Sequence, residues 1–411
     1  MKCAVVCFVI TAILTWTGEC APQMKRSEFV SKLLSDYDEK FPPNIDADSP
    51  TVVSCDVIVE SFDRINELHM EYQVTLFLRF TWNDPRLIFD KAVNMSMITL
   101  DAGFVSKFWV PDIFFTNSKS GSFHQLTVTN KYLEIFRNGN VTFVGRLSLI
   151  LSCPMDLVKF PLDGQMCPLR LESFAFKKSQ MELRWFGKNP VRFNRHLRMA
   201  RYDLVQHENK ECYGSSHVHA YPCLEIRFFL QRKVGFYLIQ VYLPSVLIVS
   251  VSWISFWINA EAIPARVSLS VVTILAMITQ SSGINAALPK VSYVKAIDVW
   301  VAMCQIFVFA ALIQYAFISM LIREEIKPVQ FKQIRKKKPA NGDAEEMRMM
   351  DQSKKTDDER HPETKISDSK RTARRLDFMS RWLYPTAFLV FNIVYWIVYC
   401  SLSNKWVPGM P

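Results

Sequence analysis

Four long stretches without a charged residue dominate the second half of this chain of 411 residues. They cover residues 235–258, 267–289, 299–322 and 382–404. A helix that crosses a bilayer needs about 20 consecutive apolar residues, so each stretch is long enough to span a membrane. Half of all residues are apolar and only 21% are charged, which argues against a disordered chain. The sequence therefore predicts an integral membrane protein with four spans.

A fifth charge-free stretch lies near the N-terminus and has a different character. Residues 3–18 follow Lys2 and precede the small residues around Ala21, but the stretch is too short to span a bilayer. This pattern predicts a cleaved signal peptide at residues 1–20, and an uncleaved anchor is the alternative. Residues 21–234 then form a domain on the far side of the membrane, large enough to fold by itself.

Charge between the third and fourth spans predicts the topology. Residues 323–381 hold 17 Lys and Arg against 12 Asp and Glu, a net +5 out of the chain's +10. Because Lys and Arg concentrate on the cytoplasmic side, this loop is expected in the cytoplasm, with both termini and the tail 405–411 outside the cell. We expect the loop to be largely disordered apart from helical extensions of the spans. Nucleic acid is a weak alternative partner for its basic runs.

Five cysteines fall within residues 21–234, so at most two bridges and one free thiol can form. They are Cys55, Cys153, Cys167, Cys212 and Cys223. If each cysteine pairs with its neighbour in the sequence, bridges form between Cys153 and Cys167 and between Cys212 and Cys223. Spacing alone leaves other pairings open. Zinc ligation is disfavoured in an oxidising compartment, and we expect no cofactor.

The predicted outer domain consists mostly of strands. Residues 71–82 alternate, which places Val74, Leu76, Leu78, Phe80 and Trp82 on a core face and Thr75, Phe77, Arg79 and Thr81 on the other face. Asn138-Gly139 between two apolar runs indicates a two-residue hairpin. The pattern predicts a β-sandwich followed by four helices.

Two sequons begin at Asn94 and Asn140 and are compatible with glycosylation outside the cell.

Three groups of motifs resemble a known family. The segment Cys153-Pro-Met-Asp-Leu-Val-Lys-Phe-Pro-Leu-Asp-Gly-Gln-Met-Cys167 is similar to the signature loop of the Cys-loop pentameric ligand-gated ion channels. Pro264-Ala-Arg266-Val-Ser-Leu and Leu288-Pro-Lys-Val-Ser-Tyr resemble the anion-selective branch. The second cysteine pair, Cys212 and Cys223, is similar to the second disulfide of glycine receptors and of invertebrate glutamate-gated chloride channels. The resemblance implies an extracellular β-sandwich on a four-helix membrane domain. Five copies are expected around a pore in the plasma membrane, with a postsynaptic location as one expectation.

A helix at residues 265–284 would carry a polar and apolar stripe. Spacings of four, three, four and three put the following residues on one side: Ser268, Val272, Leu275, Thr279 and Ser282. An apolar ring at Leu275 between polar rings suits a pore that closes by excluding water. Alternatively, these hydroxyl groups join helices within a bundle.

Selectivity for chloride is expected from the inner mouth of this pore. Five copies of Arg266 would form a positive ring there, preceded by Pro264 and Ala265 as in the anion branch. In an unrelated helix, Arg266 would instead extend to lipid headgroups. Val272 departs from the threonine that is usual in this branch, which affects hydration and blocker binding.

An agonist site between neighbouring subunits follows from the resemblance. On the principal face the matching positions are Phe114, Ser173, Phe174 and Tyr221, and on the complementary face Phe77 and Arg79. Aromatic faces attract an ammonium group and a guanidinium binds a carboxylate, so a zwitterionic amino acid would fit both halves. Packing is the alternative role of each single aromatic residue.

Several positions do not decide which agonist the chain binds. Val144 and Val218 replace the serine and threonine that are usual in glycine- and glutamate-gated members. His217 and His219 share one face of an extended chain, and with His124 and His69 they are candidates for proton or zinc binding. The alternative functions are therefore a channel gated or tuned by protons, zinc or an amine such as histamine, and an auxiliary subunit that needs a partner.

Coupling between the two domains is expected where the lower loops meet the spans. The resemblance places Glu67, Phe160, Pro161, Asp163 and Arg232 there, with Asp163 and Arg232 as an ion pair or a solvated surface pair. We find no nucleotide-binding loop, metal-hydrolase motif or nucleophile elbow, and expect no enzyme activity. The expected partners are a small agonist, chloride, lipid and related subunits in a homo- or heteropentamer.

Overall fold

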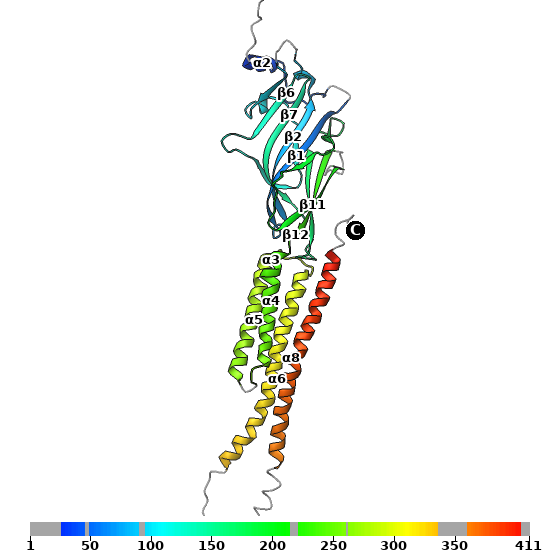
Figure 1. Cartoon of the computed structure of the whole chain (residues 1–411). Coiled ribbons are helices and arrows are strands. Elements are labelled where there is room, and N and C mark those ends of the chain that lie inside the picture. Colours follow the sequence, from blue (N-terminus) through cyan, green and yellow to red (C-terminus); the bar gives the residue numbers. More distant parts are fainter. Residues whose placement is uncertain are drawn as a thin grey trace, which may run out of the picture.

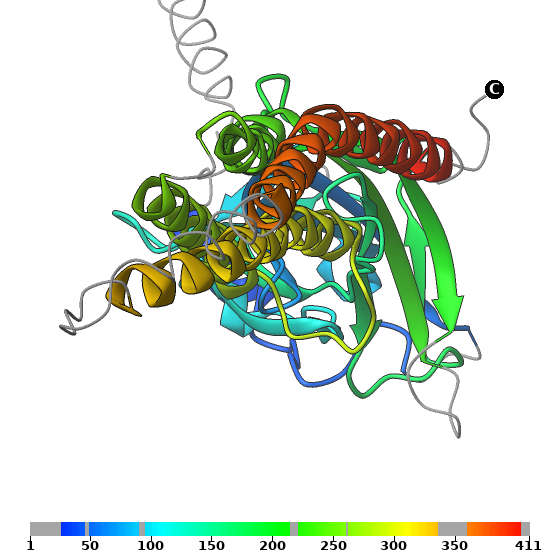
Figure 2. The same cartoon turned by 90° about the horizontal axis from the view of Figure 1, so that it is seen from below.

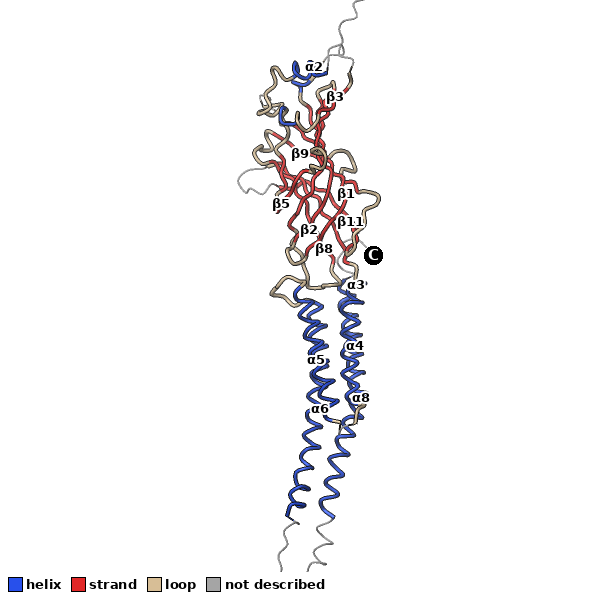
Figure 3. The backbone as a smooth tube through the Cα atoms, turned by 90° about the vertical axis from the view of Figure 1, so that its left-hand side faces the viewer, coloured by secondary structure: helices blue, strands red, loops and turns tan. Residues whose placement is uncertain are grey.

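The computed structural model describes residues 26–45, 49–89, 95–213, 221–259, 262–335 and 360–403. A domain of strands stands on one end of a bundle of long helices (Figure 1). The strands and the long helices occupy separate parts of the chain and meet in a narrow layer of loops (Figure 3). The expected β-sandwich on a helical membrane domain is confirmed.

The larger sheet has eight strands, in the order β10-β1-β2-β7-β6-β3, with β5 on β7 and β9 on β1. Its strands are β1 (Thr51–Asn66), β2 (Glu71–Asn83), β3 (Met97–Leu100), β5 (Ser118–Phe123), β6 (Lys131–Phe136), β7 (Asn140–Ser152), β9 (Met181–Trp185) and β10 (Val191–Phe193).

The smaller sheet has four strands in the order β11-β12-β8-β4. They are β4 (Ile113–Phe115), β8 (Gly164–Ser173), β11 (Tyr202–Tyr213) and β12 (Pro222–Arg232). The core lies between the two sheets, and the alternating β2 residues from Val74 to Trp82 are at most 4% exposed. The alternation in the sequence therefore identifies the core face correctly.

The hairpin between β6 and β7 turns at Asn138-Gly139. Gly139 has φ of +80°, and a Cβ there would lie 2.7 Å from the carbonyl oxygen of Asp84. Both the backbone angle and the close approach require glycine.

Both expected disulfides are present. Cys153 and Cys167 are joined by an S–S bond of 2.07 Å, and Cys212 is joined to Cys223 with a Cα–Cα distance of 5.0 Å. Cys55 is buried and unbridged, so it is the single free thiol of the expected outer domain.

A short helix, α2 (Arg26–Leu33), caps the far end of the sandwich, where Phe29 packs edge-on against Phe89 at 5.1 Å. Two 3-10 turns, Pro85–Leu87 and Val105–Lys107, connect strands at this end.

Four helical segments are long and apolar enough to cross a membrane. The first runs over Gly235–Phe256 and combines α3 (Gly235–Tyr237), a π turn (Leu238–Tyr242), α4 (Leu243–Trp253) and a 3-10 turn (Ile254–Phe256). The others lie in α5 (Ile263–Ala286), α6 (Ala296–Arg335) and α8 (Arg360–Ser403). Because α6 and α8 continue beyond the spans, the described ends of the loop 323–381 are helical. Seen along the bundle, α8 lies against α4 and α6 (Figure 2).

Candidate functional site

Strand β2 presents Phe77 and Arg79 on its non-core face. Asp56 lies opposite Arg79 in the register of β1 and β2. The carboxylate of Asp56 accepts two hydrogen bonds from Arg79, one of them at 2.6 Å from Nε, and another from Nη2 of Arg192 at 2.9 Å. The hydrogen bonds to Asp56 raise the pKa of Arg79. Arg79 therefore already has a carboxylate partner before any ligand arrives.

A second arginine lies beside Phe77. Arg146 stands opposite Phe77 in β7, and its guanidinium carbon is 5.6 Å from the centre of the Phe77 ring. The buried Nε of Arg146 has no hydrogen-bond partner. Val144 stands opposite Arg79 on the same face. Sequence reasoning missed Asp56, Arg146 and Arg192, although the alternation after Val144 places Arg146 on this face.

The smaller sheet carries the aromatic candidates. Phe114 in β4 and Phe174 after β8 are 38% and 74% exposed, and their ring centres lie 5.7 Å apart at 81°. Ser173 is buried and donates to Oδ1 of Asp112 at 2.7 Å, so its hydroxyl group stabilises the turn beneath them. Tyr221 directly precedes β12.

The two sets of candidates belong to different sheets of the chain. Phe114 and Phe174 lie side by side on the smaller sheet, and Phe77 and Arg79 lie on one face of the larger sheet. Within the described chain, the aromatic pair and the β2 residues therefore form two separate groups. His217, His219 and Val218 lie outside the described residues, as does Asn94. Asn140 begins β7, and its side-chain oxygen accepts from Asn83 at 2.9 Å.

A chain of hydrogen bonds crosses the same face below Phe77. Nε2 of His124 lies 2.8 Å from Oγ of Ser148, which lies 2.8 Å from Oγ1 of Thr75. Thr75 in turn donates to Oδ2 of Asp63 at 2.8 Å. His124 thus belongs to a continuous polar row over β5, β7, β2 and β1. Among the described residues, no three His, Cys, Asp or Glu side chains are grouped so as to hold a metal ion.

The junction is organised around Arg232, whose side chain is fully buried. Its Nε and Nη2 donate to Asp163 at 2.7 and 3.0 Å, and Nη1 donates to Glu67. Its guanidinium carbon also lies 4.5 Å from the centre of the Phe160 ring. Burial of Glu67 opposes its ionisation, but the charge of Arg232 outweighs this effect, so the pKa of Glu67 is lowered. The ion pair between Asp163 and Arg232 is therefore buried, and it is not a solvated surface pair.

The loop closed by Cys153 and Cys167 bonds directly to the helical domain. The N–H groups of Ala296 and Ile297 donate to the carbonyl oxygens of Val158 and Phe160 at 2.9 and 3.1 Å. Phe160 precedes Pro161 through a cis peptide bond and packs edge-on against Tyr237 at 5.0 Å. This loop therefore contacts both α6 and the start of the first span.

Helix α5 has one exposed and one buried side within the chain. The exposed side contains every residue of the expected stripe: Ser268, Val272, Leu275, Thr279 and Ser282. Ser270, Thr273 and Met277 on the other side are at most 5% exposed. The described part of the chain thus leaves the stripe exposed, as a pore lining would require.

Arg266 corrects one expectation. At 3.6 residues per turn it lies on the buried side of α5, roughly opposite the stripe, and it is 1% exposed. Its Nη2 donates to Oδ2 of Asp377 in α8 at 2.7 Å, and its Nε donates to the carbonyl oxygen of Ile258 at 3.1 Å. The guanidinium therefore does not line the mouth as a free charge, because a carboxylate 111 residues away in the sequence pairs with it. Pro264 and Ala265 are exposed at the first turn.

These features define a membrane protein in which a β-sandwich is bonded through buried contacts to a bundle of four spans, one of which has an exposed helix face. A family model for the neurotransmitter-gated ion-channel ligand binding domain matches residues 26–234, and one for the neurotransmitter-gated ion-channel transmembrane region matches residues 241–365. The chain therefore belongs to the neurotransmitter-gated ion-channel family. It is a Cys-loop ligand-gated channel subunit. This family is not an enzyme family, and it binds an agonist and passes ions as a pentamer.

Proposed function

We propose that the chain is a subunit of a chloride channel in the plasma membrane that opens when an extracellular amino acid binds between neighbouring subunits. The observation that carries this proposal is the charge around Phe77. Three guanidinium groups, from Arg79, Arg146 and Arg192, share this part of the sheet with the carboxylates of Asp56 and Glu134, and Nε of Arg146 is unpaired. Such a face favours a ligand carboxylate.

The exposed aromatic pair, Phe114 and Phe174, would bind the ammonium group of the ligand. Phe114 and Phe174 are exposed and offer ring faces to a ligand ammonium group, which contributes about 0.5 to 2 kcal/mol depending on desolvation. In a pentamer, the principal face of one subunit would meet the complementary face of the next. An amino acid would then bridge both sets of residues, which the single chain keeps apart.

The selectivity for chloride does not depend on a free Arg266. Helix α5 has no acidic residue in its first turn and no side chain that caps its N-terminus. The positive end of the helix dipole at Pro264 and Ala265 would therefore face the inner mouth, with no acidic side chain on the first turn of α5 itself to attract cations.

Two-electrode recording from cells that express this chain alone tests the proposal. We expect current in response to one of glycine, glutamate, GABA or histamine, with a reversal potential that shifts by about 59 mV per tenfold change in chloride. A reversal potential that follows sodium instead would contradict the chloride assignment. Silence despite surface expression would favour the alternative of an auxiliary subunit, which co-expression with related subunits would then test.

A second candidate function is modulation by protons. The row from His124 through Ser148 and Thr75 to Asp63 would rearrange if the imidazole became positively charged, because Nε2 could then only donate. Replacing His124 with Gln removes the imidazole from this row and should reduce any response of the channel to a change in pH. An unchanged pH response in this variant would rule out His124 as the sensor.

A further inference from the structure

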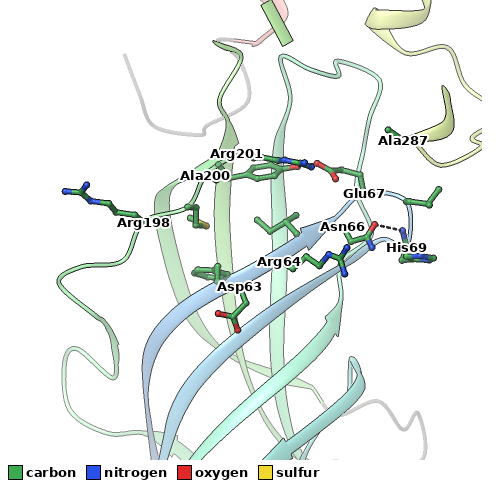
Figure 4. Close-up of a pocket in the computed structure, with 14 residues that line it drawn as sticks. Asp63, Arg64, Asn66, Glu67, His69, Arg198, Ala200, Arg201 and Ala287 are labelled. Carbon is green, nitrogen blue, oxygen red and sulfur yellow. Dashed lines mark hydrogen bonds between the residues drawn. The ribbon is translucent and has the colours of Figure 1, made fainter. Parts of the chain in front are cut away.

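A cavity of about 670 Å³ opens at the base of the β-domain. Its walls come from the end of β1 and the following turn, residues 62–69, and from the segment before β11, residues 198–202. Ala287, directly after α5, closes it on the side of the helices. The cavity therefore lies within one chain, where both sheets approach the membrane domain (Figure 4).

Some of the charged side chains that line this cavity have partners of opposite charge or hydrogen-bond donors, and others do not. Glu67 is held by Arg232 and by the hydroxyl group of Tyr202, which lies 3.0 Å away. Asp63 accepts from Thr75 at 2.8 Å. In contrast, Arg64 and Arg201 form no ion pair with any described residue. Both carboxylates are thus occupied within the protein, while the guanidinium groups remain available.

The arginines do not all point the same way. Arg64 extends toward the turn at Asn66 and His69, whereas Arg198 extends away from the other lining side chains (Figure 4). The guanidinium carbon of Arg201 lies 6.0 Å from the centre of the Phe236 ring, which is itself 56% exposed. Arg64 and Arg201 are therefore the two cations of the cavity, and Arg198 belongs to its outer rim.

The height of the cavity matches that of lipid headgroups. Phe236 is the second residue of the first span, which begins at Gly235, and Ala287 follows the last residue of α5. Span ends lie at the boundary between hydrocarbon and headgroups, so Arg201 beside Phe236 lies where phosphate groups of one leaflet are found. Guanidinium groups bind phosphate oxygens bidentately and are weakly hydrated.

We propose that this cavity binds a phosphate group through Arg64 and Arg201, supplied by the headgroup of an anionic phospholipid. Arg64 belongs to the larger sheet, and Arg201 directly precedes β11 of the smaller sheet. A bound phosphate therefore links the lower ends of the two sheets, next to the residues that contact Arg232. When phosphate occupies the cavity, it adds a contact between the two sheets at their junction with the spans, and this contact is lost when the phosphate leaves.

Native mass spectrometry of the purified full chain with phosphatidic acid tests this site. We expect the wild-type protein to retain the lipid, and the variant Arg64→Gln/Arg201→Gln to bind it at least about tenfold more weakly. Arg198→Gln is the control for charge near Arg201, because it removes one guanidinium from the same segment that points elsewhere, and it should change binding less than twofold. Equal losses in both variants, or retention by the double variant, would overturn the proposal.

A second arm separates the lipid from a free oxyanion. Inorganic phosphate is titrated against the lipid-bound protein, and the expected result is no displacement at millimolar concentrations, since the acyl chains also contribute to binding. Displacement that depends on Arg64 and Arg201 would assign the same cavity to a soluble phosphate. If the double variant fails to fold, hydrogen exchange of the wild type decides: phosphatidic acid should protect residues 62–69 and 198–202, and unchanged exchange there would refute the site.

Discussion

Asp377 in α8 holds the guanidinium of Arg266 in α5 through bonds of 2.7 and 3.3 Å, with both side chains nearly inaccessible to solvent. A neighbouring contact reinforces the same end of the bundle, because Nε of Arg381 donates to the carbonyl oxygen of Phe256 at 3.1 Å. Helix α8 thus contacts the end of the first span at Phe256 and the start of α5 at Arg266, the helix that carries the proposed pore stripe.

Replacing Asp377 with Asn should destabilise the membrane domain strongly. The change leaves the buried charge of Arg266 without its partner, and breaking a buried pair costs about 3 to 5 kcal/mol. Thermal unfolding of the detergent-solubilised chain, together with surface expression, measures the effect.

The double variant Arg266→Gln/Asp377→Asn is the control for this prediction. It removes both charges, so its stability should recover part of the loss caused by Asp377→Asn alone. Strictly additive losses would show that the two residues do not interact in the folded protein.

The buried carboxylate of Glu67 should make stability depend on acid pH. Its pKa is lowered in the folded state, so its contribution is fully present above the unfolded value of about 4.3 and is lost as pH falls through the folded value. We expect the wild-type protein to lose stability steeply below about pH 4.3, and Glu67→Gln to show a shallower slope although it is less stable at pH 7.

Glu71→Gln serves as the matched control for Glu67. Glu71 pairs with Lys119 at 2.9 Å, but both side chains are partly exposed. Exposed pairs contribute only about 0 to 1 kcal/mol, so Glu71→Gln should lose little stability at pH 7, whereas Glu67→Gln should lose more. A slope in Glu67→Gln equal to that of the wild type would contradict the role of the Glu67 carboxylate.

Leu275 should control the leak of the closed pore if the stripe lines it. Leu275→Thr makes the apolar ring wettable, so we expect a standing current without agonist and a lower agonist concentration for half-maximal response. Ile278→Thr introduces the same polar group at an exposed position that flanks the stripe and should raise the resting current much less than Leu275→Thr does. Equal leak in both variants would indicate a general loosening of α5.

Phe174 should affect agonist binding without affecting stability, since its side chain is 74% exposed. Phe174→Ala removes a contact worth about 0.5 to 2 kcal/mol and should raise the half-maximal agonist concentration by about 2- to 30-fold. Phe41→Ala, at another exposed position, should leave the response unchanged. A dose–response curve for Phe174→Ala that superimposes on the wild type would exclude Phe174 from the site.

Local patterns in the sequence were sufficient to predict much of the fold. The alternation from Val74 to Trp82 identified a core face, and Asn138-Gly139 located a hairpin, because both signals involve neighbouring residues. The four apolar stretches identified the spans for the same reason. The helical ends at Arg335 and Arg360 carry many charges, so hydropathy did not mark them.

Pairing over long distances in the sequence was not predictable in the same way. The sequence indicated that Arg266 lies near the mouth, but Asp377 is one carboxylate among many in the charged loop region, and only packing of α8 selects it. Likewise, the partnership of Arg79 with Asp56 depends on the register of β1 and β2, which a single sequence does not fix.

The bonds from Ala296 and Ile297 to Val158 and Phe160 use only main-chain atoms. Any residue except proline can donate such an N–H group, so side chains on either side of this contact can be exchanged without breaking it. These two bonds between the β-domain and the helical bundle are therefore indifferent to side-chain identity, unlike the packing of Phe160 against Tyr237. Outer domains from related chains could be grafted onto this bundle, and new agonists could thereby be brought under the control of the same pore.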